Sequence, residues 1–333
     1  MNIDKYIDAT HKLGAYLLSD SEELSEIIYK TSIYNAWFAE YNVKQALNSI
    51  AKEFLNVGKL KSWISYYHTD YAALESKKVG IVAAGNLPLV SFQDILCVIM
   101  SGHQLQIKLS EKDKILLPFI FKKWIEFLPD LNDKITIVER LDNFDAVIAT
   151  GSNNSARYFE YYFAKYKHII RKNRNSVAVL DGSETEADLI HLGHDILDYF
   201  GLGCRNVSKI FIPENYDFTL LIQALKHLDY VEQHTPYMNN LDYQRTIYLM
   251  NQTPMLDIDF INIVENTSYA SPIACLHYEY YIDIANVWSK LEQDRELLQC
   301  IVSKKDIGFG KTQQPSLFDY ADNIDTMMFL KGL

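Results

Sequence analysis

Short apolar segments that alternate with helical stretches, beginning near Lys78, constrain the fold of this chain more than any other feature. Four segments have the length and the apolar content of buried strands: Val79–Ala83, Gln104–Leu109, Ile135–Val138 and Ala146–Ala149. Two helical stretches separate the first three of them: Leu89–Met100 and Glu111–Phe127. Strands joined in this order through helices form right-handed crossovers, so the pattern predicts a parallel sheet covered by helices.

A second series of strands begins near Ser176 and predicts a second α/β unit. Its expected strands are Ser176–Leu180, Lys209–Ile212, Phe260–Val264 and Ile273–His277. Ser183 and Glu186 have the spacing of a capping box and predict the start of a helix that runs towards Cys204. The chain has 333 residues, which exceeds one simple core, so two domains are expected.

Charge, termini and cysteines exclude several function classes. The net charge of −11 argues against nucleic acid as a major partner. Met1–Lys5 lacks the apolar core of a signal peptide, and no apolar run reaches the roughly 20 residues of a transmembrane segment. The four cysteines lie far apart without a CxxC pair, so we expect neither a disulfide framework nor a metal site. The same use of cysteine favours a cytoplasmic location.

Cys204 is the strongest candidate for a catalytic residue. It lies in the segment Phe200–Asn206, between an amphipathic helix and an apolar strand, and two glycines allow a tight turn there. A cysteine on such a turn presents its thiol and its own N–H, which suits a nucleophile whose amide also holds an oxyanion. The segment alone favours the plainer interpretation, a small buried residue in a helix-to-strand turn.

Three segments follow strands of the first sheet at the edge where parallel sheets bind ligands: Gly85–Pro88, Lys108–Glu111 and Thr150–Ser152. Asn86 has an N–H for a developing negative oxygen, Lys108 suits a ribose or a phosphate, and the helix start after Gly151 suits a diphosphate. Viewed singly, these segments are more typical of a turn, a solvated lysine and a helix cap. A GxGxxG fingerprint is lacking.

The histidines give weaker signals. His234, in a loop before Pro236, is the best candidate for acid–base work. His191 and His194 lie three residues apart, but no further ligand at the right spacing completes a metal site. A surface or core role is more typical of each.

In this order the motifs resemble those of the aldehyde dehydrogenase superfamily: Gly85–Pro88, Ser101–Glu111, Thr150–Ser152 and Gly201–Cys204. Three further segments resemble its acyl-CoA reductase branch, which contains the fatty acyl reductase of bacterial bioluminescence: Arg174–Leu180, Cys204–Lys209 and Asp319–Thr326. The resemblance runs from about Lys78 to the C-terminus. It implies an aldehyde dehydrogenase-like α/β fold with two α/β domains, one of them a Rossmann-type parallel sheet.

The resemblance also implies domain roles. It implies a nicotinamide cofactor-binding domain of residues 76–174. Residues 1–75 lie outside the resemblance, but their apolar residues recur at helical spacing, so we expect a helical region packed on that domain. Residues 175–315 would form the catalytic domain, and residues 316–333 a docking segment.

Site roles follow from the same resemblance. Cys204 would be the nucleophile, and Asn86 and the Cys204 amide would form the oxyanion hole. The cofactor residues would be Lys108 and Glu111, near the adenosine ribose, and Gly151 and Ser152, at the diphosphate.

Two departures from the superfamily bear on the reaction. Hydrolytic members carry a glutamate base on the segment that opens the catalytic domain, whereas Arg171–Asn175 holds no carboxylate. A second glutamate holds the nicotinamide ribose in those enzymes, and here Ser268 takes its position, before Ser271–Pro272. Glu265 is nearby but out of register. A missing base disfavours attack by water and suits exchange with a thiol such as coenzyme A.

The resemblance therefore implies NADPH-dependent reduction of a fatty acyl-CoA to the aldehyde through an acyl group on Cys204. NADH stays open as the cofactor, and an acyl-carrier thioester stays open as the donor. The oligomeric state stays open between a single chain and a homo-oligomer, although members of the superfamily usually associate. Two alternatives remain: an NAD(P)-dependent dehydrogenase that oxidises aldehydes, and an inert binding or scaffold member.

Overall fold

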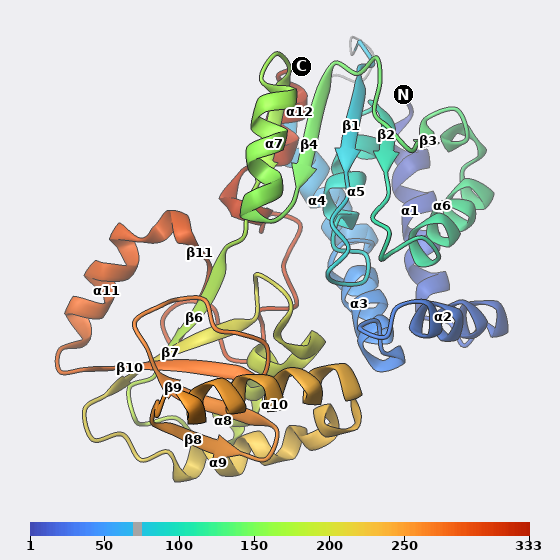
Figure 1. The fold of residues 1–333 in the computed structure, drawn as a ribbon. Helices are drawn as coiled ribbons and strands as arrows, with labels where there is room; N and C mark the ends of the chain where they lie inside the picture. Colours follow the sequence, from blue (N-terminus) through green and yellow to red (C-terminus); the bar gives the residue numbers. More distant parts are fainter. Residues whose placement is uncertain (69–74) are drawn as a thin grey trace. The chain divides into compact units, whose positions relative to one another are not determined.

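A computed structural model describes residues 1–68 and 75–333, which divide into two compact units. Unit 1 comprises residues 1–173 and 314–333, and unit 2 comprises residues 174–313. Each unit has its own sheet with helices connecting its strands (Figure 1). The predicted α/β class is confirmed. The cofactor-binding and catalytic roles assigned to the two parts stay predictions.

Unit 1 contains a parallel sheet of five strands in the order β3-β2-β1-β4-β5. The strands are β1 (Lys78–Val82), β2 (Gln104–Lys108), β3 (Ile135–Ile137), β4 (Ala146–Thr150) and β5 (Lys167–Arg171). Val82 lies opposite both Lys108 and Ala149 in the ladders. The loops after β1, β2 and β4 therefore leave the sheet side by side, as the sequence predicts.

Helices surround this sheet. They are α5 (Phe92–Met100), α6 (Leu116–Phe127), η1 (Pro129–Leu131), α7 (Asn153–Phe163), and the N-terminal α1 (Ile3–Leu17), α2 (Glu22–Tyr34), α3 (Glu40–Glu53) and α4 (Val57–Tyr67). The indole N–H of Trp124 donates to the Thr10 hydroxyl at 3.2 Å, which joins α6 to α1 inside a shared apolar core. The predicted helical region also includes residues 69–74, which lie outside the described residues.

The last residues of the chain return to unit 1 and complete its core. The segment contains η5 (Ala321–Asn323) and α12 (Thr326–Lys331). The Tyr320 hydroxyl lies 2.7 Å from the indole nitrogen of Trp63 and 2.6 Å from the hydroxyl of Tyr67. Arg171, on β5, donates to the Thr326 hydroxyl at 2.8 Å and pairs with Asp94 at 2.9 Å. Buried polar contacts therefore fasten the segment at two places.

His103 links the same segment to the start of β1. Its ring is buried, with Nδ1 accepting from the Lys77 N–H at 3.2 Å and Nε2 lying 3.0 Å from the Leu330 carbonyl oxygen. Both contacts suit a neutral ring that carries its proton on Nε2. Burial lowers the pKa of His103 below its ordinary value.

Acidification should therefore weaken unit 1 through His103. Because its pKa is lower in the folded chain, the unfolded chain binds more protons below about pH 6.5, and stability falls as the pH drops. Urea unfolding should show that the free energy of unfolding falls less between about pH 7 and about pH 5 for His103→Gln than for the wild type. His227→Gln, at an exposed position, is the control. If the free energy of unfolding fell equally in the wild type and in His103→Gln, His103 would not be the group that weakens unit 1 in acid.

Unit 2 contains a six-stranded sheet in the order β11-β6-β7-β10-β9-β8. The strands are β6 (Asn175–Val179), β7 (Val207–Pro213), β8 (Met255–Ile258), β9 (Ile261–Glu265), β10 (Cys275–Tyr281) and β11 (Leu298–Val302). All neighbours are parallel except β8 and β9. The helical elements are α8 (Glu186–Leu197), η2 (Asp198–Gly201), α9 (Thr219–Leu225), η3 (Lys226–Gln233), α10 (Thr235–Met250), α11 (Ile284–Gln293) and η4 (Arg295–Leu297).

The predicted capping box at Ser183 and Glu186 is wrong. The box is formed by Thr185 and Asp188: the Thr185 hydroxyl accepts from the Asp188 N–H at 3.2 Å, and the Asp188 carboxylate accepts from the Thr185 N–H at 3.0 Å. The start of α8 is therefore displaced from the position that the serine suggested.

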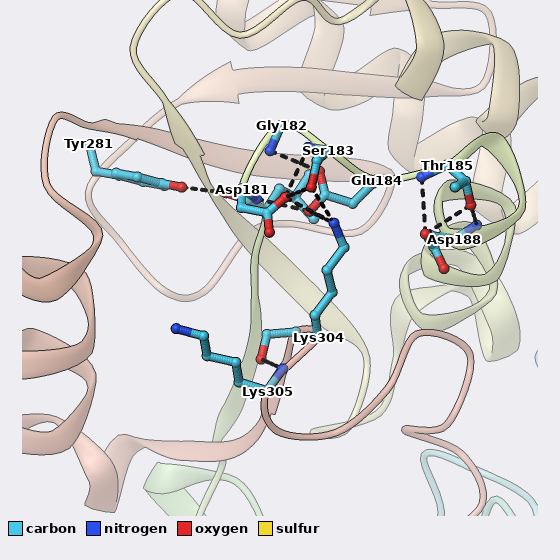
Figure 2. A network of polar contacts seen from close by, with 11 residues as sticks. Asp181, Gly182, Ser183, Glu184, Thr185, Asp188, Tyr281, Lys304 and Lys305 are labelled. Carbon is cyan, nitrogen blue, oxygen red and sulfur yellow. Dashed lines mark hydrogen bonds and ion pairs between the residues drawn. The ribbon is translucent and has the colours of Figure 1, made fainter.

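A polar network before Thr185 explains the displacement (Figure 2). The Ser183 hydroxyl donates to Asp181 at 2.6 Å, and Lys304 approaches the same carboxylate at 3.0 Å. These contacts hold the pKa of Asp181 well below its ordinary value. Glu184 accepts from the backbone N–H groups of Asp181 and Gly182 at 2.8 and 3.1 Å. The segment thus folds on itself as a turn, and the helix begins after it.

Within the described residues, no helix combines the length and the apolar content needed to cross a membrane.

Candidate active site

Cys204 lies in the turn between η2 and β7, as predicted, and the residue is partly exposed. The helix before it ends earlier than expected, at Leu197. Tyr199, Phe200 and Gly201 then take left-handed φ angles of 54°, 60° and 70°. Glycine adopts such angles freely, but tyrosine and phenylalanine do so only where surrounding contacts enforce them. Strained backbone of this kind is frequent at functional sites.

Asn206 fixes the shape of the Cys204 turn. Its side-chain oxygen accepts from the Gly203 N–H at 2.9 Å, and its backbone N–H donates to the Gly203 carbonyl at 3.0 Å. Its side-chain nitrogen donates to the carbonyls of Asp195 and Asp198 at 3.1 and 2.8 Å. The buried amide thus ties the turn to the end of α8. In the sequence, only the pattern Gly-x-x-Asn indicated that Asn206 would hold this turn.

A loop lies beside the turn and is held by Asp195. This buried carboxylate accepts from the Gly310 N–H at 2.6 Å and from the Thr312 hydroxyl at 2.8 Å, and burial raises its pKa. The guanidinium of Arg205 reaches both the Thr312 carbonyl and the Cys300 sulfur at 3.4 Å. The four cysteines, all within the described part of the chain, form no disulfide.

The histidines of unit 2 have local structural contacts. His234 caps α10, its Nδ1 accepting from the Tyr237 N–H at 3.2 Å, and its ring stacks on Phe200 with centroids 3.8 Å apart. The His194 ring lies 3.0 Å from the Asp198 carboxylate, which raises the pKa of His194. Over residues 1–68 and 75–333, no group of three or more potential ligands is arranged to hold a metal ion.

The structure brings together the candidate residues of unit 1 at one edge of its sheet. Asn86, in the loop after β1, and Lys108, the last residue of the neighbouring β2, are both exposed. Gly151 follows β4, and Ser152 caps α7, its hydroxyl accepting from the Ser155 N–H at 3.2 Å. This edge therefore presents an amide, an ammonium group and a capped helix start.

The prediction that Glu111 stands at a helix start is wrong. It lies in a turn before α6, which begins at Leu116, and its exposed carboxylate pairs with Lys114 at 2.7 Å. The N-terminal helices hold this turn: the Tyr34 hydroxyl donates to the Glu111 carbonyl at 2.9 Å, and the Asn35 side chain to the Lys112 carbonyl at 3.2 Å. Sequence reasoning found no function for that region.

Asp113 is the carboxylate that actually meets the start of α6. It is buried and accepts from the Leu117 N–H at 3.4 Å and from the Leu89 N–H at 3.3 Å. Leu89 has a left-handed φ of 56° in the loop that carries Asn86. Asp113 therefore connects the Asn86 loop to the turn after Lys108. An aspartate three residues before an apolar helix was the signal available in the sequence.

Gly85 is required by a close approach between two of these loops. A Cβ at this position would lie 2.3 Å from the Ser110 hydroxyl oxygen and 2.6 Å from the Ser110 Cβ. We expect Gly85→Ala to lower the stability of unit 1 by about 1–3 kcal/mol and to displace Asn86, reducing activity. Gly308→Ala is the control, because its nearest atom would be 4.0 Å away. Thermal unfolding measures the stability of each variant, and turnover measures its activity. A Gly85→Ala protein with the stability of the wild type would contradict the packing argument.

The structure also places the two segments that depart from the superfamily pattern, the one that begins at Arg171 and the one around Ser268. Arg171 is buried in the ion pair with Asp94. Ser268 lies in the loop between β9 and β10, where its hydroxyl donates to the Ala270 carbonyl at 3.0 Å. The buried Lys209 holds the same loop through the Thr267 carbonyl at 2.7 Å. Glu265 ends β9 and is exposed.

Residues 11–253 match the protein family described as Acyl-CoA reductase (LuxC). No curated protein matches this sequence. Among solved structures, the aldehyde dehydrogenase KauB from Pseudomonas aeruginosa is similar, with 13% identity and a TM-score of 0.65 over 90% of this chain and 76% of that one. Aldehyde dehydrogenase 21 from Physcomitrella patens is also similar, with 13% identity and a TM-score of 0.66 over 91% of this chain and 74% of that one.

A third structure, of an indole-3-acetaldehyde dehydrogenase in complex with NAD+, gives 12% identity and a TM-score of 0.65 over 87% of this chain and 69% of that one. At these identities the similarity establishes the aldehyde dehydrogenase-like fold.

Proposed function

Because the chain belongs to the acyl-CoA reductase (LuxC) family, we propose that it reduces a fatty acyl-CoA to the aldehyde, with NADPH as reductant and Cys204 as nucleophile. Family membership makes the chain an oxidoreductase that acts on acyl or aldehyde groups. The observation that carries the finer proposal is the Cys204 turn, in which a partly exposed cysteine lies on a backbone held by hydrogen bonds with Ser176 and Asn206.

In the proposed reaction the Cys204 thiolate attacks the thioester carbonyl carbon, and coenzyme A leaves as a thiolate with the electron pair of the broken C–S bond. The Cys204 amide and the Asn86 side chain donate to the oxygen that gains negative charge, each worth about 3 kcal/mol in comparable sites. The nicotinamide cofactor supplies the hydride to the acyl carbon. Reforming the carbonyl then breaks the bond to Cys204 and releases the aldehyde.

The carboxyl edge of the unit 1 sheet fits such a cofactor. A Cβ at Gly151 would lie 2.9 Å from atoms of Ser155 and Phe159, so the backbone here runs close against α7. The start of α7 offers backbone N–H groups to a diphosphate, with Ser152 as its cap. Lys108 is exposed one loop away for the adenosine ribose, and Glu111 follows it. An indole-3-acetaldehyde dehydrogenase of similar fold was solved in complex with NAD+, which supports a nicotinamide cofactor.

The segment that leads from β5 into unit 2 favours thiol exchange over hydrolysis. Arg171 is buried in its pair with Asp94, and no carboxylate lies between it and Asn175. Without a carboxylate on this segment to activate water, an acyl group on Cys204 should persist until it is reduced or returned to a thiol.

The test is product analysis with a series of acyl-CoA chain lengths. Purified protein with NADPH or NADH should give loss of nicotinamide absorbance together with one equivalent of aldehyde and of free coenzyme A. Free acid formed from an aldehyde and NAD(P)+ without coenzyme A would instead establish the oxidative dehydrogenase. A protein that binds no nucleotide and forms no product would be the inert member. An acyl-carrier thioester, run in parallel, separates the two donors.

A further inference from the structure

Ser176 lies where two irregularities of the unit 2 sheet meet. The pairing of β6 with β7 shifts register between Ser176 and Val177, and the pairing of β6 with β11 shifts between Leu298 and Ile301. Such irregularities leave backbone groups outside the regular ladder and are common beside active sites, where they redirect the chain. The Ser176 side chain is completely buried between these strands.

The hydroxyl of Ser176 bonds one backbone group on each side. Its Oγ donates to the Cys204 carbonyl oxygen at 2.8 Å and accepts from the Cys300 N–H at 3.0 Å. A hydroxyl has one donor and two acceptor sites, so a single side chain serves both groups. The carbonyl of the nucleophile is thereby tied to the sheet rather than to the turn.

Both peptide groups that flank Cys204 are consequently fixed. The Gly203 carbonyl, which shares a peptide plane with the Cys204 N–H, accepts from the Asn206 N–H at 3.0 Å. The Cys204 carbonyl is held by Ser176. Because peptide groups are planar, these two contacts set the directions of the Cys204 N–H and of its Cα–Cβ bond together.

We propose that Ser176 is a positioning residue for acylation of Cys204, an inference that rests on the proposed role of this cysteine. It aligns the thiol and the N–H of Cys204 so that attack on a carbonyl carbon and support of the resulting oxyanion occur in one geometry. Alkylation at a saturated carbon forms no oxyanion and should not need this alignment.

The experiment compares two reactions of the same thiol in the full chain. p-Nitrophenyl acetate acylates a thiolate: an S–C bond forms, the ester C–O bond breaks, and p-nitrophenolate leaves with the electron pair as a measurable burst. Iodoacetamide alkylates the thiolate and releases iodide. Ser176→Ala is the test variant. Ser303→Ala is the matched control, a buried serine of unit 2 whose hydroxyl oxygen accepts from the N–H groups of Lys305 and Asp306.

We expect Ser176→Ala to slow the burst by about 10- to 100-fold, as for a small misplacement of a reacting group, while alkylation stays within about twofold. Ser303→Ala should change neither rate constant by more than about twofold. Should Ser176→Ala not fold, Ser176→Thr and Ser176→Val compare nearly equal volumes with and without the hydroxyl, and the burst should be faster in the threonine protein.

Equal reductions of acylation and alkylation, or an unchanged burst, would overturn the proposal, since either result makes Ser176 merely structural. A wild type that gives no burst would overturn it as well. A wild type that gives the burst but reduces no acyl thioester would refute the proposed function alone, and the comparison of variants would still decide the role of Ser176.

Discussion

Cys204→Ala should reduce acyl-CoA-dependent NADPH oxidation by about a thousandfold or more, because it removes the only atom proposed to bond the acyl group. The variant should still bind the nicotinamide cofactor, whose proposed residues all belong to unit 1. Intact-protein mass spectrometry after addition of acyl-CoA alone should show the acyl adduct on the wild type and none on the variant.

Cys275→Ala is the matched control for this result. Cys275 lies in the same unit, and burial raises its pKa, so its thiol should stay protonated and unreactive at neutral pH. The Cys275→Ala variant should still form the acyl adduct and keep most of the activity. Cys204→Ala protein that retained full turnover would remove Cys204 from the mechanism, whatever the behaviour of the control.

Removal of residues 314–333 should unfold unit 1. Four side chains of this segment are almost fully buried in the unit 1 core: Leu317, Tyr320, Met327 and Leu330. At about 1.5–3 kcal/mol for each such side chain, their loss amounts to about 6–12 kcal/mol. A typical domain has about 5–15 kcal/mol of stability in total. The truncated protein should show a large loss of protection from hydrogen exchange in β1, β2 and β4.

Tyr320→Phe separates the polar from the apolar part of this contact. It keeps the ring and removes the hydroxyl that joins Trp63 and Tyr67, so the cost should be about 1–3 kcal/mol, with unit 1 still folded. Phe318→Ala, at a partly exposed neighbour, should cost less. If the truncated chain kept native exchange protection in β1, the segment would be an accessory rather than part of the core.

Local patterns in the sequence were sufficient to predict eight of the eleven strands of the described residues and the turn that carries Cys204, but they missed β5, β8 and β11. The apolar segments around Ile81, Ile107 and Ile148 are short, bounded by turn residues and buried on both faces, and this pattern depends on neighbouring residues alone. The position of Cys204 after a helix and before a strand follows from the same periodicity. The resemblance of the ordered motifs then supplied the family.

Contacts between distant residues could not be predicted in this way. The start of α6 depends on a buried Asp113 that also meets Leu89, and a serine placed by spacing alone at the start of α8 is drawn instead into a network with Lys304. Ser176 has its function only because residues 204 and 300 lie on either side of it in space. No local signal distinguishes Ser176 from an ordinary polar residue.

The discontinuity of unit 1 has a consequence for biosynthesis. The polypeptide leaves unit 1 after residue 173, and the residues that close its core begin only at residue 314. The intervening 140 residues, 174–313, take about 7–28 s to translate at about 5–20 residues per second. During that interval the nascent chain can assemble unit 2 as one continuous piece. The surfaces of Trp63 and Tyr67 that later receive Tyr320 stay uncovered until Tyr320 itself has left the ribosome.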